Sequence, residues 1–232
     1  VSLLTLHNPV ELGHRIAMLD HLTRGRLQWG IGHRAIAEDL KLFGLDHLQG
    51  DEVRERAAEA LDLILEMWES EGEFSFKGKY FDINAPALDP IRERGYHMRP
   101  LQQPHPPIFA AASSSRSASI RTAAQRGYKP MSSSGLAHRY LAEHWDVIED
   151  AAAEAGTEVN RSDWRVARDV FIAETDELAR ERAKAVLGRN YIQHQLPNRA
   201  NSGQIQNAKI NDNVADDDLD VDYMIDNIWI VG

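Results

Sequence analysis

The sequence predicts an α/β fold, in which parallel strands are covered by helices. Short β-forming segments alternate along the chain with segments whose apolar residues recur at helical spacing. Gly and Pro separate these segments, as they do at the ends of strands and helices. This alternation favours either a (β/α) barrel or an open doubly wound sheet. The length of 232 residues is enough to bury a core of that size.

The first part of the chain is expected to run helix, strand, helix. Asn8 can cap a helix, Pro9 suits its first position, and Glu11 completes a capping box. Residues 27–32 are predicted to form a short strand that ends in glycine, and residues 51–68 a second helix. The expected buried stripe of this helix consists of Ala57, Ala60, Leu61, Ile64, Leu65 and Trp68.

Residues 72–106 interrupt the alternation. Aromatic residues surround a turn at residues 77–79, and six prolines lie between positions 86 and 107. Proline favours extended chain over helix. We therefore expect a hairpin or an irregular excursion over 72–106.

The alternation then resumes within what we predict to be a single domain over 1–232. The expected elements are a strand at 108–112, a helix at 117–126, a short strand at 128–131, a helix at 137–155, a β-rich segment at 164–173 and a helix at 177–187. The polar stretch 188–222 has few strong helix or strand formers. It is predicted to be a mobile loop or an insertion.

Three consecutive serines, Ser113, Ser114 and Ser115, stand at the seam between the strand at 108–112 and the next helix. Ligands of parallel α/β folds bind at the carboxyl ends of the strands. A helix N-terminus there offers unpaired N–H groups and a partial positive charge, which suit an anion. Small residues let a phosphate approach closely, and their hydroxyls add donors. The pattern suits a phosphate site, but the local sequence alone favours the alternative that one serine caps the helix.

Basic side chains follow a second seam of the same kind. His33 and Arg34 come directly after the glycine that ends the strand at 27–32. In a parallel sheet they would emerge on the ligand face, and Arg54 of the next helix could point there too. The alternatives are a solvated loop for His33 and Arg34, and for Arg54 a solvated helix face paired with Glu52, Glu55 or Glu59.

Composition excludes several classes of function. Lys and Arg number 26 and Asp and Glu 36, so the net charge of −10 argues against unspecific binding to nucleic acid or anionic membranes. No apolar run approaches the ~20 residues of a membrane span.

The lack of cysteine excludes disulfides and thiolate metal sites and fits a cytoplasmic protein. The acidic run at 216–222 lacks the glycine and glutamate of a calcium loop, so no metal site is predicted.

Several segments, in this order and at this spacing, resemble the luciferase-like flavin-dependent monooxygenases. They are LDHLTRGRL at 19–27, GIG at 30–32, LFG at 42–44, the proline-rich approach at 99–108, AAQRG at 123–127 and the Pro130-Met131 pair. The similarity covers most of residues 5–190 and extends to 222–232.

This resemblance implies a (β/α)8 TIM-type barrel with an insertion, incomplete at both ends in this chain. It also implies that reduced FMN and O₂ oxygenate a small apolar organic substrate: an aldehyde, ketone, alkane or terpene. The FMN phosphate is expected at Ser113, Ser114 and Ser115, approached by His33 or Arg34 and helped by Arg54. No catalytic residue is assigned, because the family usually supplies it from chain that precedes residue 8.

Partners and alternatives follow from the same resemblance. Reduced FMN is expected from a separate NAD(P)H-dependent flavin reductase, the stretch 188–222 could act as a lid, and a homodimer is expected. One alternative is an oxidoreductase of the same superfamily that transfers hydride with the deazaflavin F420. Another is a non-catalytic subunit that only binds flavin.

Overall fold

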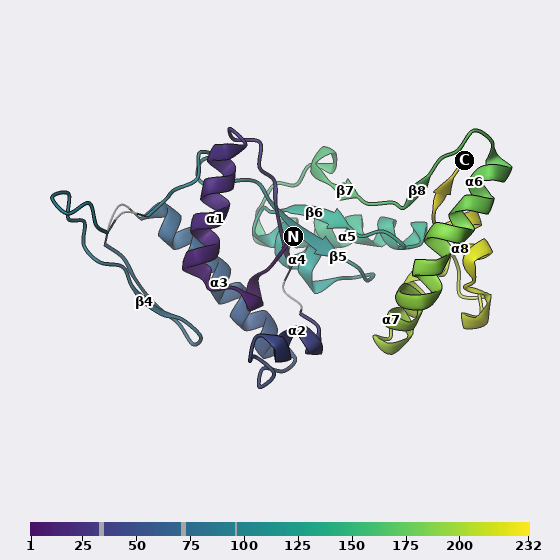
Figure 1. Cartoon of the computed structure of the whole chain (residues 1–232), viewed down its shortest axis with the longest axis horizontal. Helices are drawn as coiled ribbons and strands as arrows, with labels where there is room; N and C mark the ends of the chain where they lie inside the picture. Colours follow the sequence, from purple (N-terminus) through teal and green to yellow (C-terminus); the bar gives the residue numbers. More distant parts are fainter. Residues whose placement is uncertain (33–34, 71–72, 96) are drawn as a thin grey trace. The chain divides into compact units, whose positions relative to one another are not determined.

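The computed structural model describes residues 1–32, 35–70, 73–95 and 97–232 of the chain (Figure 1). The chain divides into two compact units, Val1–Phe109 and Ala110–Gly232, where the sequence led us to expect one domain. The border falls within strand β5 (Ile108–Ala112). The strand order of the larger sheet is β1-β2-β5-β6-β7.

The first unit combines two parallel strands with helices. Strand β1 pairs with β2 so that Ser2 lies opposite Ile31, and the N–H of Trp29 donates to the carbonyl of Pro107 directly before β5. Its elements are β1 (Ser2–Leu3), α1 (Pro9–Leu22), β2 (Trp29–Gly32), α2 (Ala37–Leu42) and α3 (Asp51–Glu69).

Helix α1 begins at the predicted residue and packs beside α3 (Figure 1), but the predicted capping box is not formed, because the carboxylate of Glu11 accepts from Arg15. The Asn8 side chain accepts a hydrogen bond from the N–H of Glu11, and Pro9 is the first helical residue. The two helices approach closely at Gly13, where a Cβ would overlap the Cε of Met67. The buried residues of α3 are Val53, Ala57, Ala60, Leu61, Leu63, Ile64, Met67 and Trp68.

Asp20, near the end of α1, ties this helix to the segment that leads into β5. It is fully buried, and its carboxylate accepts hydrogen bonds from the backbone N–H and the side-chain Nε2 of Gln102, at 2.7 and 2.8 Å.

Asp20→Ala should lower the free energy of unfolding by about 2–3 kcal/mol, because two donors lose their acceptor. Urea unfolding measures this, with the exposed Asp46→Ala, expected within ~0.5 kcal/mol of the parent, as control. Equal effects of the two changes would contradict the assigned role of Asp20.

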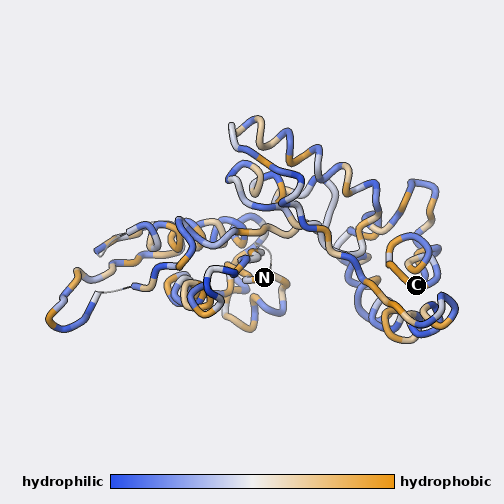
Figure 2. Tube along the Cα trace, turned by 90° about the horizontal axis from the view of Figure 1, so that it is seen from above, coloured by the Kyte–Doolittle hydropathy of each residue, from blue (hydrophilic) through white to orange (hydrophobic). Residues whose placement is uncertain are grey.

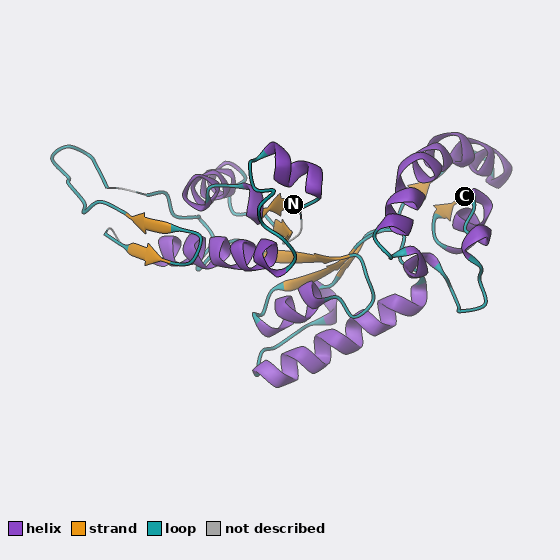
Figure 3. Cartoon of the chain, turned by 90° about the horizontal axis from the view of Figure 1, so that it is seen from below, coloured by secondary structure: helices purple, strands orange, loops and turns teal. Residues whose placement is uncertain are grey.

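A hairpin forms within residues 72–106. Strands β3 (Ser75–Lys77) and β4 (Asp82–Asn84) pair antiparallel and lie side by side in Figure 3. The carboxylate of Glu59 on α3 accepts hydrogen bonds at 2.7–2.8 Å from the backbone N–H groups of residues 79–81 in its turn. A charged acceptor therefore holds the hairpin turn against α3.

The second unit repeats the strand–helix–strand pattern. Helix α4 (Ala118–Gln125) connects β5 to β6 (Lys129–Ser132), and α5 (His138–Ala155) leads on to β7 (Arg165–Val166). Strands β6 and β7 pair in parallel, with Met131 opposite Arg165. Hydrophobic and hydrophilic positions alternate along the helices (Figure 2). The core between α4 and α5 includes Ile120, Ala124, Ile148, Ala151 and Ala152.

The stretch 188–222, where we expected a mobile loop or an insertion, consists largely of helical turns. A π-helical turn at Tyr191–Gln195 leads into α7 (Leu196–Asn201), and shorter turns follow before α8 (Val221–Asn227). Tyr191 and Leu219 of this stretch are buried in one core together with Leu136, Tyr140 and Trp229, whereas Ile192 and Ile210 are exposed. Tertiary packing thus overrides weak local propensity here. Movement of this stretch as a lid stays a prediction.

The chain ends in a small parallel pair. Strand β8 (Val170–Phe171) pairs with β9 (Ile230–Val231), and α6 (Asp176–Ala183) follows β8. Within the described residues the parallel strands form open sheets, and no closed barrel is found.

Candidate functional site

The candidate site lies at the carboxyl ends of β5 and β6 in the second unit. Ser113 follows β5 directly, and Ser133 follows β6. The N–H of Ser133 donates to the carbonyl of Ala112 at 2.9 Å, so the two strand ends lie side by side. This is the edge at which parallel α/β folds bind ligands.

Two buried side chains hold the backbone of the serine segment. The Nδ2 of Asn207 donates to the carbonyl of Ser113 at 3.1 Å. The Nε2 of His144 lies 2.6 Å from the carbonyl of Ser114. A carbonyl can only accept, so this ring nitrogen carries the hydrogen. The two hydrogen bonds therefore orient the carbonyl groups of Ser113 and Ser114 toward the interior of the unit.

The N–H groups of Ser114 and Ser115 consequently point away from Asn207 and His144. In a trans peptide the C=O of one residue and the N–H of the next are opposed. The carbonyls of Ser113 and Ser114 are turned toward Asn207 and His144, so the next two N–H groups face away from these side chains. Within the described part of the chain, neither N–H donates a hydrogen bond. Two adjacent free amides of this kind suit an anion.

His144 belongs to a chain of hydrogen bonds that runs through the interior. The indole N–H of Trp164 donates to Ser132 Oγ at 2.9 Å, and Ser132 Oγ lies 2.9 Å from the Nδ1 of His144. With Nε2 protonated toward Ser114, Nδ1 accepts from the Ser132 hydroxyl. Every donor then has an acceptor when the imidazole is neutral. Burial lowers the pKa of His144, against the opposite effects of the Ser114 carbonyl and Glu143.

The helix that follows the serines starts later than the sequence predicted. Helix α4 begins at Ala118, its N-cap is Ser117, and the Ser117 side chain makes no capping hydrogen bond. The alternative in which a serine of 113–115 caps this helix is therefore wrong. Arg116, with a φ of 36°, turns the chain between the serines and the cap. The three serines thus form a separate turn ahead of the helix.

The family profile described as luciferase-like monooxygenase matches residues 1–232. This chain belongs to the luciferase-like monooxygenase family. The expectation drawn from the sequence motifs is confirmed.

Two named relatives have sequences similar to this luciferase-like chain. 2,5-Diketocamphane 1,2-monooxygenase 1 of Pseudomonas putida is 28% identical, over 99% of this chain and 64% of the relative. Limonene 1,2-monooxygenase of Rhodococcus erythropolis is 31% identical, over 84% of this chain and 47% of the relative. The chain therefore spans less than two thirds of the length of these relatives.

A solved structure agrees with the fold. It is the oxygenating constituent of 3,6-diketocamphane monooxygenase from Pseudomonas putida, a type II Baeyer–Villiger monooxygenase in complex with FMN. The similarity has a TM-score of 0.87 at 26% identity and covers 100% of this chain and 64% of that chain. The predicted luciferase-like α/β fold is confirmed.

The predicted basic residues of the luciferase-like site have different outcomes. Arg54 lies on α3 in the first unit, its side chain is 60% exposed, and it forms an ion pair with Asp51. The partner is thus Asp51, in place of the three glutamates considered from the sequence. His33 and Arg34 lie outside the described residues. Of the predicted site residues, the structure brings together Ser113, Ser114 and Ser115.

Two positioning residues escaped the sequence analysis. His144 falls on the buried stripe of α5 with Tyr140 and Ile148. A histidine on an otherwise apolar stripe is a signal for a buried hydrogen bond. Asn207 carries no such signal, because it stands in a polar stretch. Among the described residues, no group of three or more His, Asp or Glu could hold a metal ion, and no helix is long and apolar enough to cross a membrane.

The lowered pKa of His144 predicts a pH dependence of stability. Below pH ~6.5, the ordinary histidine value, the unfolded chain takes up a proton that the buried ring refuses, so the free energy of unfolding falls as the pH drops. His144→Gln removes this contribution, and its unfolding free energy should fall less steeply with decreasing pH, by up to about 1.4 kcal/mol per pH unit. Urea unfolding of both proteins between pH 7.5 and ~5 measures the difference. Identical pH profiles would contradict a buried, neutral His144.

Proposed function

We propose that this protein is an FMN-dependent monooxygenase that uses reduced FMN and O₂ to oxygenate a small apolar organic substrate. The observation that carries the proposal is the pair of free amides at Ser114 and Ser115, at the carboxyl edge of the sheet. Family membership and the FMN complex of the similar 3,6-diketocamphane enzyme support it.

The residues of the serine segment fit a flavin phosphate. The amides of Ser114 and Ser115 would donate to its oxygens, and the hydroxyls of Ser113, Ser114 and Ser115 offer further donors. Helix α4 adds the partial positive charge of its N-terminus, which no side chain caps. His33, Arg34 and Arg54 remain proposed cationic contributors to the same site.

The residues of this chain bind and position the cofactor. Bound reduced FMN supplies the oxygen chemistry, which is a property of the flavin. Asn207 and His144 fix the carbonyls of the serine segment, so the two amides are oriented before any phosphate arrives. A fixed phosphate would in turn fix the position of the isoalloxazine ring relative to the substrate.

The proposed substrate is an apolar cyclic ketone or terpene, within the wider class of aldehydes, ketones, alkanes and terpenes. The names of the similar diketocamphane and limonene monooxygenases support this choice. We further propose a cytoplasmic homodimer that receives reduced FMN from a separate NAD(P)H-dependent flavin reductase. Light scattering and reconstitution with such a reductase would test these two points.

Flavin titration and oxygen uptake test the proposal together. FMN should quench the fluorescence of the five tryptophans on binding, and reduced FMN with a cyclic terpene ketone should give O₂ uptake coupled to an oxygenated product. Hydride transfer from reduced F420 without O₂ uptake would overturn the monooxygenase in favour of the F420 alternative. FMN binding without turnover would favour the non-catalytic subunit. The absence of any flavin binding would overturn the proposal altogether.

A further inference from the structure

A polar pocket of about 280 Å³ opens beside Ser113 in the second unit. Besides this serine, its lining consists of Ser134, Gln195, Asn198, Arg199, Ser202 and Gln204. The lining thus has one cation and no carboxylate. The pocket is smaller than the ~300–1,000 Å³ typical of whole small-molecule sites, so it suits a charged headgroup better than an entire cofactor.

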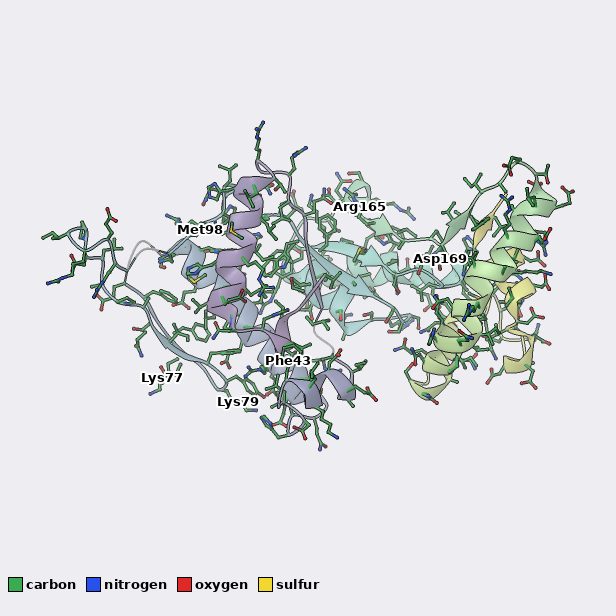
Figure 4. All side chains as sticks on the ribbon, in the orientation of Figure 1. Phe43, Lys77, Lys79, Met98, Arg165 and Asp169 are labelled. Carbon is green, nitrogen blue, oxygen red and sulfur yellow. The ribbon has the colours of Figure 1, made fainter. Side chains whose placement is uncertain are left out.

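Arg199 forms no ion pair within the described part of the chain, although the carboxylate of Asp169 is near enough to affect its pKa. Two other arginines of this unit do form ion pairs: Arg139 with Asp212 at 2.6 Å, and Arg180 with Asp226 at 2.7 Å. Asp169, labelled in Figure 4, has a buried carboxylate oxygen, Oδ2, that accepts no hydrogen bond within the described residues. Burial lowers the pKa of Arg199, against the opposite influences of Tyr191 and Asp169. A partly buried guanidinium without an anion is costly, and a bound anion would relieve that cost.

The guanidinium of Arg199 lies directly against the backbone of Gly135. A Cβ at this position would overlap the Nη2 of Arg199, and the backbone of Gly135 has a φ of +74°. The residue follows Ser133 and Ser134, which come directly after β6. A glycine here keeps Arg199 beside the strand ends of β5 and β6, where Ser113 and Ser134 line the same pocket.

We propose that this pocket receives a phosphate monoester, the 5′-phosphate of FMN, and that Arg199 is the cation that binds it. The inference rests on the proposed flavin-binding function and adds a residue to it. A guanidinium can donate two parallel hydrogen bonds to phosphate oxygens. Ser113 lines the pocket and is also the first residue of the serine segment, so the pocket lies directly beside the proposed phosphate site. Gly135 accommodates both the positive φ of this turn and the close approach of the guanidinium.

Parallel titrations with FMN and riboflavin test Arg199, because riboflavin lacks only the phosphate. The parent protein should bind FMN at least tenfold more tightly than riboflavin. Arg199→Gln should weaken FMN binding at least tenfold and leave riboflavin affinity within twofold. Arg189→Gln makes the same charge change at an exposed arginine and should leave both affinities unchanged. Inorganic phosphate should compete with FMN in the parent protein and much more weakly in Arg199→Gln.

A second pair of variants tests the role of Gly135. Gly135→Ala should displace the guanidinium and weaken FMN binding about tenfold. Gly156→Ala is the matched control, since Gly156 has a similar φ of +69° but nothing within 4 Å of a Cβ. Both changes strain the backbone alike, and circular dichroism would confirm that both proteins fold. Only Gly135→Ala should change the preference for FMN over riboflavin.

The outcomes separate this inference from the proposed function. If the parent prefers FMN and Arg199→Gln behaves like Arg189→Gln, Arg199 does not bind the phosphate, although the flavin function stands. If the parent binds FMN and riboflavin equally, the phosphate pocket is wrong. If no flavin binds the parent, the proposed function fails, and this inference fails with it.

Discussion

Replacing Ser114 with aspartate should weaken FMN binding about 100-fold and leave riboflavin binding within about twofold. The new carboxylate would stand at the residue whose amide is turned toward the proposed phosphate. Two unit charges ~5 Å apart at an effective dielectric constant of ~20 repel by about 3 kcal/mol, which corresponds to about 100-fold in affinity. Tryptophan fluorescence titrations with the two flavins measure the effect.

Ser114→Asn is the matched control for this change. Asparagine has nearly the size of aspartate and no charge, so its loss of FMN affinity should stay below about tenfold. Equal losses for the two variants would mean that steric exclusion, and not charge, determines binding at Ser114. Unchanged FMN affinity in Ser114→Asp would contradict a phosphate at the serine segment.

Tyr191→Ala should lower the free energy of unfolding by about 4 kcal/mol, the range for a large aromatic residue in a core. Tyr191 is fully buried, its ring lies edge-on to Trp229 at 5.6 Å between centroids, and its hydroxyl donates to the carbonyl of Leu219 at 2.9 Å. Burial also raises the pKa of this hydroxyl to about 12. Urea unfolding followed by tryptophan fluorescence measures the loss.

Two neighbouring changes make this prediction specific. Tyr191→Phe removes only the hydroxyl and should cost about 1 kcal/mol. Ile192→Ala truncates a side chain that is 48% exposed. It should lower the free energy of unfolding by less than about 1 kcal/mol. If Tyr191→Ala were as mild as Ile192→Ala, residues 188–222 would behave as the mobile loop that the sequence suggested, and their packed core would be wrong.

Local chemistry explains what the sequence predicted well. Asn8, Pro9 and Glu11 act within one helical turn, so the start of α1 could be placed from neighbouring residues alone. The run at β5 is apolar because both faces of the strand are covered, and Ile108, Phe109 and Ala110 are indeed buried. The alternation of such segments was sufficient for the α/β class.

Long-range partners explain what the sequence could not predict. Asn207 lies 94 positions after Ser113, yet its side chain orients the carbonyl of Ser113. His144 reaches Ser114 across 30 positions. No local pattern connects residues so far apart, and the helical turns around Tyr191 pack their buried ring against Trp229, 38 positions later in the chain. The start of α4 was missed by one residue, because the turn at Arg116 has no proline or glycine to mark it.

The most direct test of the phosphate site is the backbone amide spectrum of the protein during flavin titration. Amide proton and nitrogen-15 chemical shifts should be followed together in a correlation spectrum. The signals to follow are those of Ser114 and Ser115, whose N–H groups donate no hydrogen bond within the described chain. Saturating FMN should shift both amide protons strongly downfield, and saturating riboflavin should leave them nearly unchanged. If FMN binds and neither amide signal moves, the phosphate lies elsewhere and the serine segment does not hold it.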